Sequence, residues 1–231
     1  MKIAAVADVH SPRFLEDFNS SLDVLTPPDI FLMAGDMVNR GKADEIVSVL
    51  DSIRSKLGED FPIVACFGNE EYSEARKEII EFADNRMVFL DEKSTILEID
   101  GIKLGIVGTQ GSLDKATNWQ RRNIPSIKKI FERRARRAAS LLKGLEQKTD
   151  RKLLLMHYSP CLETCEGEET KSFAWLGSRK FYTLIEKYQP DIVIHGHVHN
   201  SVRHRAFIGP TVVYNVAFPA VGKITELNLW A

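Results

Sequence analysis

The chain has 231 residues, of which 44% are apolar, and its 31 basic and 32 acidic side chains leave a net charge of −1. This composition excludes disordered and collagen-like proteins, and no apolar run approaches the roughly 18–20 residues of a membrane span. The first ten residues, MKIAAVADVH, are too soon interrupted by Asp8 for a secretory signal, and three Cys cannot all pair internally. We therefore predict a cytoplasmic protein with a single domain over residues 1–231.

The predicted elements alternate, in chain order, between β-rich runs and helical patterns. Several runs are continuously apolar, as in strands buried on both faces, and strands are predicted at residues 2–7, 30–34, 63–67, 87–90, 95–99, 103–107, 152–156, 191–194, 202–207, 212–216 and 224–229. Apolar side chains spaced three or four apart predict helices at residues 14–25, 46–57, 79–82, 127–145 and 181–188. The first half follows the order of parallel βαβ units, and residues 159–171 form a long acidic loop.

Charge is distributed unevenly along the chain. Residues 121–152 contain twelve Lys/Arg and three Asp/Glu, a local charge of +9, whereas the remainder has 19 basic and 29 acidic residues and a charge of −10. A solvated helix face is one explanation of the basic segment. Binding of a nucleic acid is the functional alternative.

Polar side chains of metal-binding type follow five predicted strands. They are Asp8, His10, Asp36, Asn69, His157, His197 and His199. Ligands bind outside the carboxyl ends of strands in open α/β sheets, so we expect these seven side chains at one edge. Alternation along an extended strand would point Asp8 and His10 the same way, and likewise His197 and His199.

This set of oxygen and imidazole ligands suits two divalent metal ions. We expect manganese, with iron, zinc, magnesium or nickel as alternatives. Asp36 is the candidate for a carboxylate that bridges both ions, and Gly35 would let the backbone approach them. Each strand-end His taken alone would more often be structural. The ordered series favours a shared metal site.

The chain resembles the calcineurin-like metallophosphoesterase family over residues 8–199, through the ordered motifs Asp8-x-His10, Gly35-Asp36, Gly68-Asn69, His157 and Gly196-His197-x-His199. The resemblance implies an α/β (α+β) fold, a four-layer αββα sandwich with a dinuclear site. It also implies that Asp8, His10 and His199 hold one ion. Asn69, His157 and His197 would hold the other, with Asp36 bridging.

One motif departs from the family pattern, which is usually Gly-Asn-His-Asp/Glu. This chain has Gly68-Asn69-Glu70-Glu71, so Glu70 takes the place of the His that serves as general acid or contacts substrate. An ionised Glu cannot donate a proton, and only burial that raised its pKa would let Glu70 act as a general acid. An ionised Glu also repels a phosphate dianion more than a singly charged diester. We therefore predict a metal-dependent phosphodiesterase, with Asp36, Asn69 and Glu70 as the candidate catalytic residues.

Four arginines are candidate substrate-binding residues. Arg40 lies in residues 35–41, which are similar to a Gly-Asp-x-Val-Asp-Arg-Gly signature of Ser/Thr protein phosphatases, and a guanidinium matches two phosphate oxygens. Arg13 follows His10 closely, while Arg121 and Arg122 adjoin Trp119, an aromatic that could stack on a base. The alternative for Arg40 is a solvated side chain. For Arg121 and Arg122 it is a hydrophobic staple followed by a basic N-terminal turn of the long helix.

Several functional alternatives stay open. The expected substrate is a small phosphodiester or a nucleotide-type molecule. The same fold could instead serve a phosphoprotein phosphatase, which Arg40 suggests, or a non-catalytic metal-binding interaction protein, which Glu70 suggests. Cys161 and Cys165 flank a turn in the acidic loop and are either structural or a redox or third metal site. The sequence carries no indication of oligomeric state.

Overall fold

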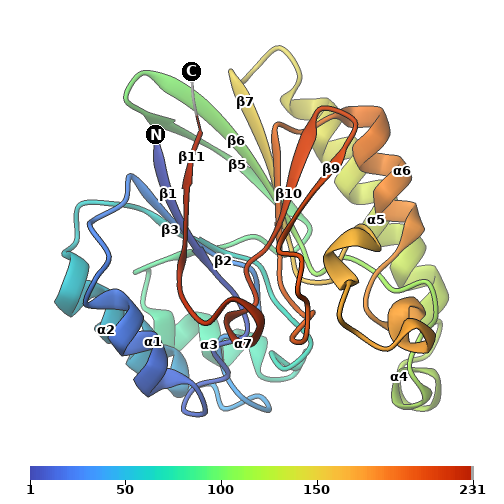
Figure 1. The fold of residues 1–231 in the computed structure, drawn as a ribbon, viewed down its shortest axis with the longest axis horizontal. Coiled ribbons are helices and arrows are strands. Elements are labelled where there is room, and N and C mark those ends of the chain that lie inside the picture. The colour runs from blue at the N-terminus through green and yellow to red at the C-terminus, as the bar shows by residue number, and fades with distance from the viewer. Residues whose placement is uncertain (230–231) are drawn as a thin grey trace.

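Two β-sheets lie face to face at the centre of the computed structural model, which describes residues 1–229 (Figure 1). The first sheet contains, in spatial order, β11 (Thr225–Asn228), β1 (Lys2–Val6), β2 (Ile30–Met33), β3 (Ile63–Ala65) and β4 (Val88–Phe89). The second contains β5 (Lys93–Ile99), β6 (Ile102–Thr109), β7 (Arg151–Met156), β8 (Ile192–His195), β10 (Thr211–Asn215) and β9 (Arg205–Ile208).

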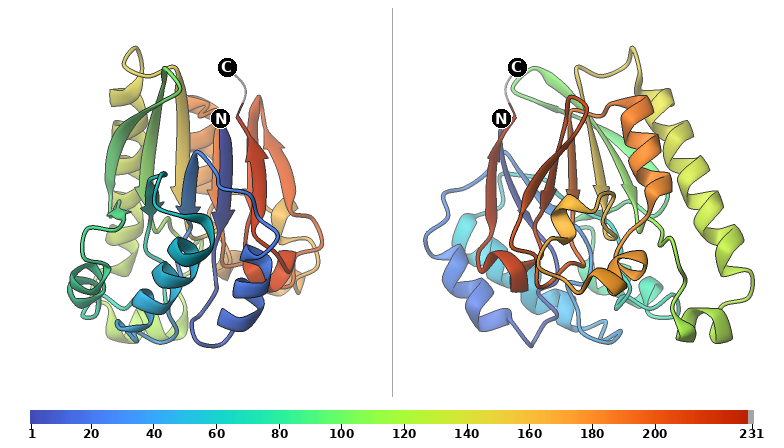
Figure 2. Two further views of the ribbon diagram at one scale, coloured as in Figure 1. Left: turned by 90° about the vertical axis from the view of Figure 1, so that its left-hand side faces the viewer. Right: turned by 45° about the vertical axis from the view of Figure 1, so that its right-hand side comes forward.

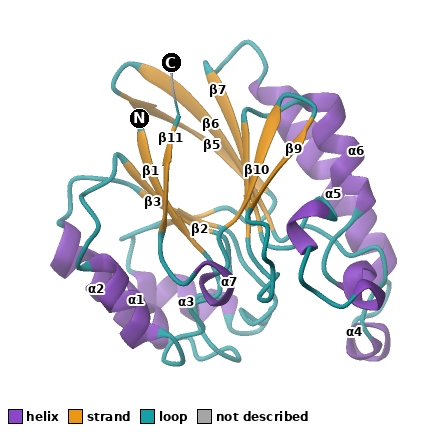
Figure 3. Ribbon diagram, in the orientation of Figure 1, coloured by secondary structure: helices purple, strands orange, loops and turns teal. Residues whose placement is uncertain are grey.

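Helices cover the outer face of each sheet, which completes the predicted four-layer sandwich (Figure 2, Figure 3). The first sheet is covered by α1 (Leu15–Leu22), α2 (Glu45–Leu57) and α3 (Arg76–Ala83), and the second by α5 (Ile127–Leu145) and α6 (Arg179–Tyr188). Shorter pieces are α4 (Asn118–Asn123), α7 (Phe218–Val221) and two 3₁₀ turns, η1 (Glu163–Cys165) and η2 (Thr170–Trp175).

Alternating side chains explain why the central strands are apolar throughout. In β1, Ile3 and Ala5 enter the core between the sheets, whereas Ala4 and Val6 enter the core under α1–α3. In β7, Leu155 faces the inter-sheet core and Leu154 the core under α5 and α6. Each strand buries both faces, so its composition is set by two cores at once.

The strands that precede the candidate ligands run parallel. Ile3 lies opposite Ile30 in the β1–β2 pair, and Leu154 lies opposite Val193 in the β7–β8 pair. Their carboxyl ends therefore meet on one side of the molecule.

The strand predicted at residues 202–207 is displaced, because β9 begins only at Arg205. The N–H of Val202 donates to the Glu166 carbonyl, outside the sheet.

Candidate metal centre

All seven predicted ligands lie beyond the carboxyl ends of β1, β2, β3, β7 and β8. The prediction of one sheet edge was wrong in detail, because the first three strands belong to one sheet and the last two to the other. The site is therefore built where the ends of two sheets converge. Six of the ligands form two clusters, Asp8 with His10 and His199, and Asp36 with His157 and His197, and the ligand atoms in each cluster lie within 4.8 Å of one another.

The first ligand cluster is organised by the buried carboxylate of Asp8. Its Oδ1 lies 2.9 Å from Nε2 of His199 and 3.7 Å from Nε2 of His10, and its Oδ2 accepts the backbone N–H of His197 at 2.8 Å. Nε2 of His10 is buried and has no hydrogen-bond partner in residues 1–229. Such an atom is rare inside proteins and indicates a missing partner.

The second ligand cluster surrounds the fully buried ring of His157. Its Nδ1 must donate to the Ala34 carbonyl, 2.9 Å away, because a carbonyl oxygen only accepts. Its Nε2 faces two oxygens, Oδ2 of Asp36 at 3.3 Å and Oδ1 of Asn69 at 3.1 Å. A neutral imidazole would turn a lone pair towards acceptors there, so this geometry calls for a second proton or a cation.

Charge-dependent pKa shifts agree with this conclusion. Burial alone would lower the pKa of His157, but the carboxylates of Asp36 and Asp8 outweigh it and raise that pKa to about 10. Burial opposes ionisation of Asp8 as well, yet its hydrogen bond to His199 and the nearby imidazoles lower the Asp8 pKa to about 2. Burial lowers the pKa of His197 to about 3. The carboxylates of Asp36 and Asp8 thus favour a positive charge at His157, whereas His197 is neutral.

Turns, and not extended strands, aim the ligands. Asp8, His10, Asp36 and His197 all have left-handed φ values, of 60°, 45°, 53° and 70°. Asp8 and His10 do point into one ligand cluster, as predicted, but a turn and not strand alternation brings them together. The prediction was wrong for His197 and His199, which point into different ligand clusters. Left-handed non-glycine residues are strained and concentrate at functional sites.

Gly35 is required by a close approach between two backbones. A Cβ atom at Gly35 would lie 2.5 Å from the Gly68 nitrogen and 2.9 Å from Nδ1 of His157. The φ of Gly35 is also +87°, a value that side chains disfavour. This glycine therefore brings the loop after β2 against the loop after β3, and so sets Asp36 beside Asn69.

Glu71 fastens these same two loops. Its carboxylate accepts four backbone N–H groups, from Asp36 at 2.7 Å, Met37 at 2.6 Å, Val38 at 3.3 Å and Gly68 at 2.6 Å. Burial, together with the charge of Asp36, raises the Glu71 pKa to about 7. The resemblance assigned an acidic residue to this position, but only the structure gives its partners.

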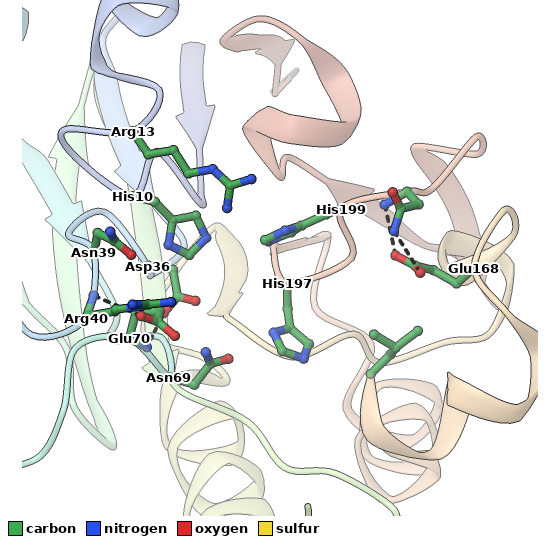
Figure 4. Close-up of a pocket in the computed structure, with 12 residues that line it drawn as sticks. His10, Arg13, Asp36, Asn39, Arg40, Asn69, Glu70, Glu168, His197 and His199 are labelled. Carbon is green, nitrogen blue, oxygen red and sulfur yellow. Dashed lines mark hydrogen bonds between the residues drawn. The ribbon is translucent and has the colours of Figure 1, made fainter.

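A cleft of about 370 Å³ opens over the ligands (Figure 4). Its lining consists of His10, Arg13, Asp36, Asn39, Arg40, Asn69, Glu70, Glu168, Leu176, His197, His199 and Asn200. The structure thus brings Arg13, Arg40 and Glu70 together at one cleft. Arg121 and Arg122 do not line it and lie exposed on α4, so their substrate-binding role stays a prediction.

Glu70 is joined to the loop that carries Arg40. Its Oε2 accepts the Arg40 backbone N–H at 2.8 Å (Figure 4). Its backbone carbonyl accepts the N–H of Gly41 at 2.8 Å. Arg40 has a left-handed φ of 50°. The Glu70 side chain therefore stabilises the turn from which the Arg40 guanidinium enters the cleft.

A buried glutamine links the two halves of the site. Oε1 of Gln110 accepts from Nη2 of Arg134 on α5 at 2.6 Å and from Nη2 of Arg76 on α3 at 2.9 Å. Arg76 also donates to the Glu71 carbonyl at 3.1 Å, and the Gln110 carbonyl accepts the N–H of Tyr158, the residue after His157. Gln110 was not predicted as a site residue, because a lone Gln after a strand carries no pattern.

Neighbouring polar residues support the site without lining it. His195 is buried between the Thr164 hydroxyl and the Gly196 carbonyl, each 2.9 Å from a ring nitrogen, and burial lowers its pKa to about 4. Asn215 donates to the Val198 carbonyl at 2.9 Å and so holds the backbone between His197 and His199.

The cysteines of the acidic loop are free and buried. Burial raises the pKa of Cys161 and raises that of Cys165 to about 12, so both are protonated thiols. In the part of the chain that the structure describes, neither belongs to a cluster of candidate metal ligands. These surroundings favour the structural alternative.

Comparison with known families and structures agrees with this site. A family model for calcineurin-like phosphoesterases matches residues 1–201. The chain belongs to the calcineurin-like phosphoesterase family. Within residues 1–229, no helix is both long and apolar enough to cross a membrane.

Similar solved structures come from bacteria and plants. Phosphopantetheinyl hydrolase from Mycobacterium tuberculosis has a TM-score of 0.66 at 17% identity, over 95% of this chain and 89% of that one. TT1561 of Thermus thermophilus has a TM-score of 0.61 at 17% identity, over 98% of each chain. Yellow lupin purple acid phosphatase PPD1 has a TM-score of 0.53 at 15% identity, over all of this chain and 46% of its own. These identities establish a common fold only, and no curated protein sequence matches this chain.

Proposed function

We propose that the protein is a metal-dependent phosphodiesterase with two divalent ions in its cleft. The observation that carries this proposal is the position of the His157 ring, whose Nε2 faces two oxygen acceptors while its Nδ1 is committed to the Ala34 carbonyl. The unpartnered Nε2 of His10 supports a cation in the other ligand cluster. The residues of both ligand clusters therefore fit a bound divalent ion.

Each ligand cluster would hold one ion. Asp8, His10 and His199 would hold one ion, Asn69, His157 and His197 the other, and Asp36 would bridge them. Two divalent ions bound there would polarise a phosphoryl oxygen and make water nucleophilic near neutral pH. Manganese suits these mixed ligands, with iron, zinc, magnesium and nickel as alternatives.

The protein's own contribution is to position the substrate phosphate. Arg13 and Arg40 line the cleft, where their guanidinium groups can pair with non-bridging phosphate oxygens. The Glu70 carboxylate, held by the Arg40 N–H, adds a negative charge to the same wall. That charge opposes a dianionic monoester more strongly than a singly charged diester. Diesters with good leaving groups are therefore the proposed substrates.

A comparison of two chromogenic substrates tests this proposal. With Mn²⁺ we expect bis-p-nitrophenyl phosphate to have the higher kcat/KM and p-nitrophenyl phosphate the lower. Faster turnover of the monoester would overturn the diester preference, and turnover of phosphopeptides would favour a phosphoprotein phosphatase. Bound metal without turnover of any ester would favour the non-catalytic interaction protein.

A matched pair of histidine variants controls for indirect effects. His157→Ala removes a ligand of the second cluster, whereas His204→Ala removes a histidine whose Nε2 pairs with the Ser201 carbonyl outside the cleft lining. We expect activity to be lost only in His157→Ala. Equal activity of the two variants would contradict the metal centre.

A further inference from the structure

Helices α4 and α5 carry a dense positive charge on their outer surface. Nine of their residues are Lys or Arg, against the single acidic residue Glu132. Arg134 turns inward to Gln110, and the remaining eight are exposed: Arg121, Arg122, Lys128, Lys129, Arg133, Arg136, Arg137 and Lys143. We call these eight side chains the basic face.

The basic face lacks the acidic partners that other cations of the molecule have. Lys2 lies 2.8 Å from Glu226, Arg76 lies 3.1 Å from Asp91, and Arg54 lies 3.2 Å from Glu59. Within residues 1–229, no carboxylate lies within 4.0 Å of a basic-face cation, because Glu132 pairs instead with Lys180 of α6. Unpaired like charges repel one another, and a polyanion would relieve that repulsion.

An exposed aromatic side chain adjoins the basic face. Trp119 is 63% exposed, and it lies on α4 two and three residues before Arg121 and Arg122. The helix beneath it is firmly started, since Thr117 and Gln120 form a reciprocal capping box. An indole held outward beside cations is a platform on which an unpaired base can stack.

The apolar surface of these helices argues against a bilayer as the polyanion. The stripe of α5 that includes Phe131, Ala138 and Leu142 is buried. Of the described residues in α4 and α5, Trp119 is the one large apolar side chain in the exposed class. A membrane-surface helix inserts a whole apolar face into the bilayer, whereas the apolar face of α5 is buried against the rest of the protein.

The basic face begins next to the cleft. Nε2 of Gln120 lies 3.4 Å from the hydroxyl of Tyr158, the residue after His157. The backbone N–H of Lys115 donates to the carbonyl of Ala174, two residues before the cleft-lining Leu176. Figure 1 shows α4 at the same end of the sandwich as the carboxyl ends of the strands. From there α5 extends for 19 residues, or about 28 Å.

We infer that the basic face binds single-stranded nucleic acid and leads it into the metal cleft. The cations would pair with successive phosphates, and Trp119 would stack on a base near the cleft. Binding stands independently of the proposed function, whereas hydrolysis of the bound strand rests on it.

Fluorescence anisotropy with labelled oligo(dT) and oligo(U) of about 20 nucleotides tests this inference. EDTA in the buffer prevents metal-dependent hydrolysis of the probe, so a failure of the diesterase proposal would not affect the result. We expect binding that weakens steeply between about 50 and 200 mM salt. In the triple variant Arg122→Ala/Lys128→Ala/Lys129→Ala, affinity should fall at least about tenfold and the log–log salt slope by about 2, at about 0.7 per phosphate contact.

Two further variants make the test specific. Trp119→Ala should weaken binding about tenfold through lost stacking without changing the salt slope. The control Lys56→Ala/Lys77→Ala/Lys223→Ala removes the same charge from exposed positions elsewhere and should bind like the wild type. Absence of binding at low salt, equal losses in both triple variants, or binding to phosphatidylserine vesicles without binding to oligonucleotides would overturn the inference.

Discussion

The two ligand clusters differ in how firmly the protein holds them. His157 in the second cluster is fully buried, bonded through Nδ1 to Ala34, and its ring lies 5.4 Å from that of Tyr158. In the first cluster the His199 side chain is 34% exposed, and Nε2 of His10 has no hydrogen-bond partner within residues 1–229. Both clusters contribute side chains to the cleft lining, but the central His157 of the second is fully buried and held in place, so that cluster is the better preorganised for an ion. We therefore expect the second ion to bind more tightly and the first to exchange faster.

Replacing one histidine in each cluster should have the largest effect and tests directly whether the two clusters bind their ions unequally. His157→Ala should lower kcat/KM at least about a hundredfold and abolish tight binding of one ion, because its ring is a buried ligand. His199→Ala should lower activity too, but it should leave the tight ion in place. Metal content after gel filtration measures the difference, and greater metal loss in His199→Ala would contradict the assignment.

The cleft wall gives the next largest effect. Arg40→Ala and Glu70→Ala should each raise KM for a diester about tenfold, the first by losing a phosphate contact and the second by freeing the Arg40 turn. Glu70→Gln keeps an oxygen that can accept the Arg40 N–H, so its KM should lie nearer the wild type. Should Glu70→Gln instead lose kcat as fully as Glu70→Ala, Glu70 would be a proton donor.

The Gln110 bridge between the two sheets should give a smaller effect on the ions. Gln110→Ala leaves the guanidinium groups of Arg76 and Arg134 without their shared acceptor, which should cost about 2 kcal/mol of unfolding free energy. Affinity for the second ion should fall several-fold, because Arg76 contacts the Glu71 carbonyl beside Asn69. Gln110→Glu keeps the acceptor and should restore that affinity. Equal ion affinities in both variants and the wild type would show that the bridge does not position the ligands.

The last prediction concerns the pH dependence of stability and not catalysis. The pKa of His157 is raised from 6.5 to about 10, so its protonated form stabilises the EDTA-treated protein fully below pH 6.5 and loses that contribution as pH rises through 10. A metal ligand must be neutral, so the Mn²⁺-loaded protein should not show this loss. Urea unfolding between pH 7 and 10 measures both. A flat profile in the EDTA-treated protein would contradict the protonated pair with Asp36.

The sequence was informative where burial dictates composition. All eleven predicted strands exist. Strands buried on both faces, such as β1, β2 and β7, leave continuous apolar runs, and their parallel pairing brings their polar ends together. Helix α4 was missed because its six residues bury no side chain, although the capping box from Thr117 to Gln120 was a usable indication. Helix α7, with four residues, is too short for periodicity.

Ligand direction could not be predicted by strand alternation. Asp8 and His10 take left-handed conformations because their backbone N–H groups donate to carbonyls in the loop after β2. The bonds from Glu71 to that same loop, and those of Gln110 to its two arginines, likewise join residues 24 to 35 positions apart. Such contacts depend on the completed fold, and no local pattern encodes them.

Stoichiometric metal titration of the EDTA-treated protein tests the central claim most directly. Mn²⁺ is added in small steps, and hydrolysis of bis-p-nitrophenyl phosphate is measured at each step. A dinuclear diesterase with unequal ligand clusters predicts little turnover during the first equivalent and a steep rise during the second. Full turnover at one equivalent, or turnover that persists in EDTA, would contradict the account.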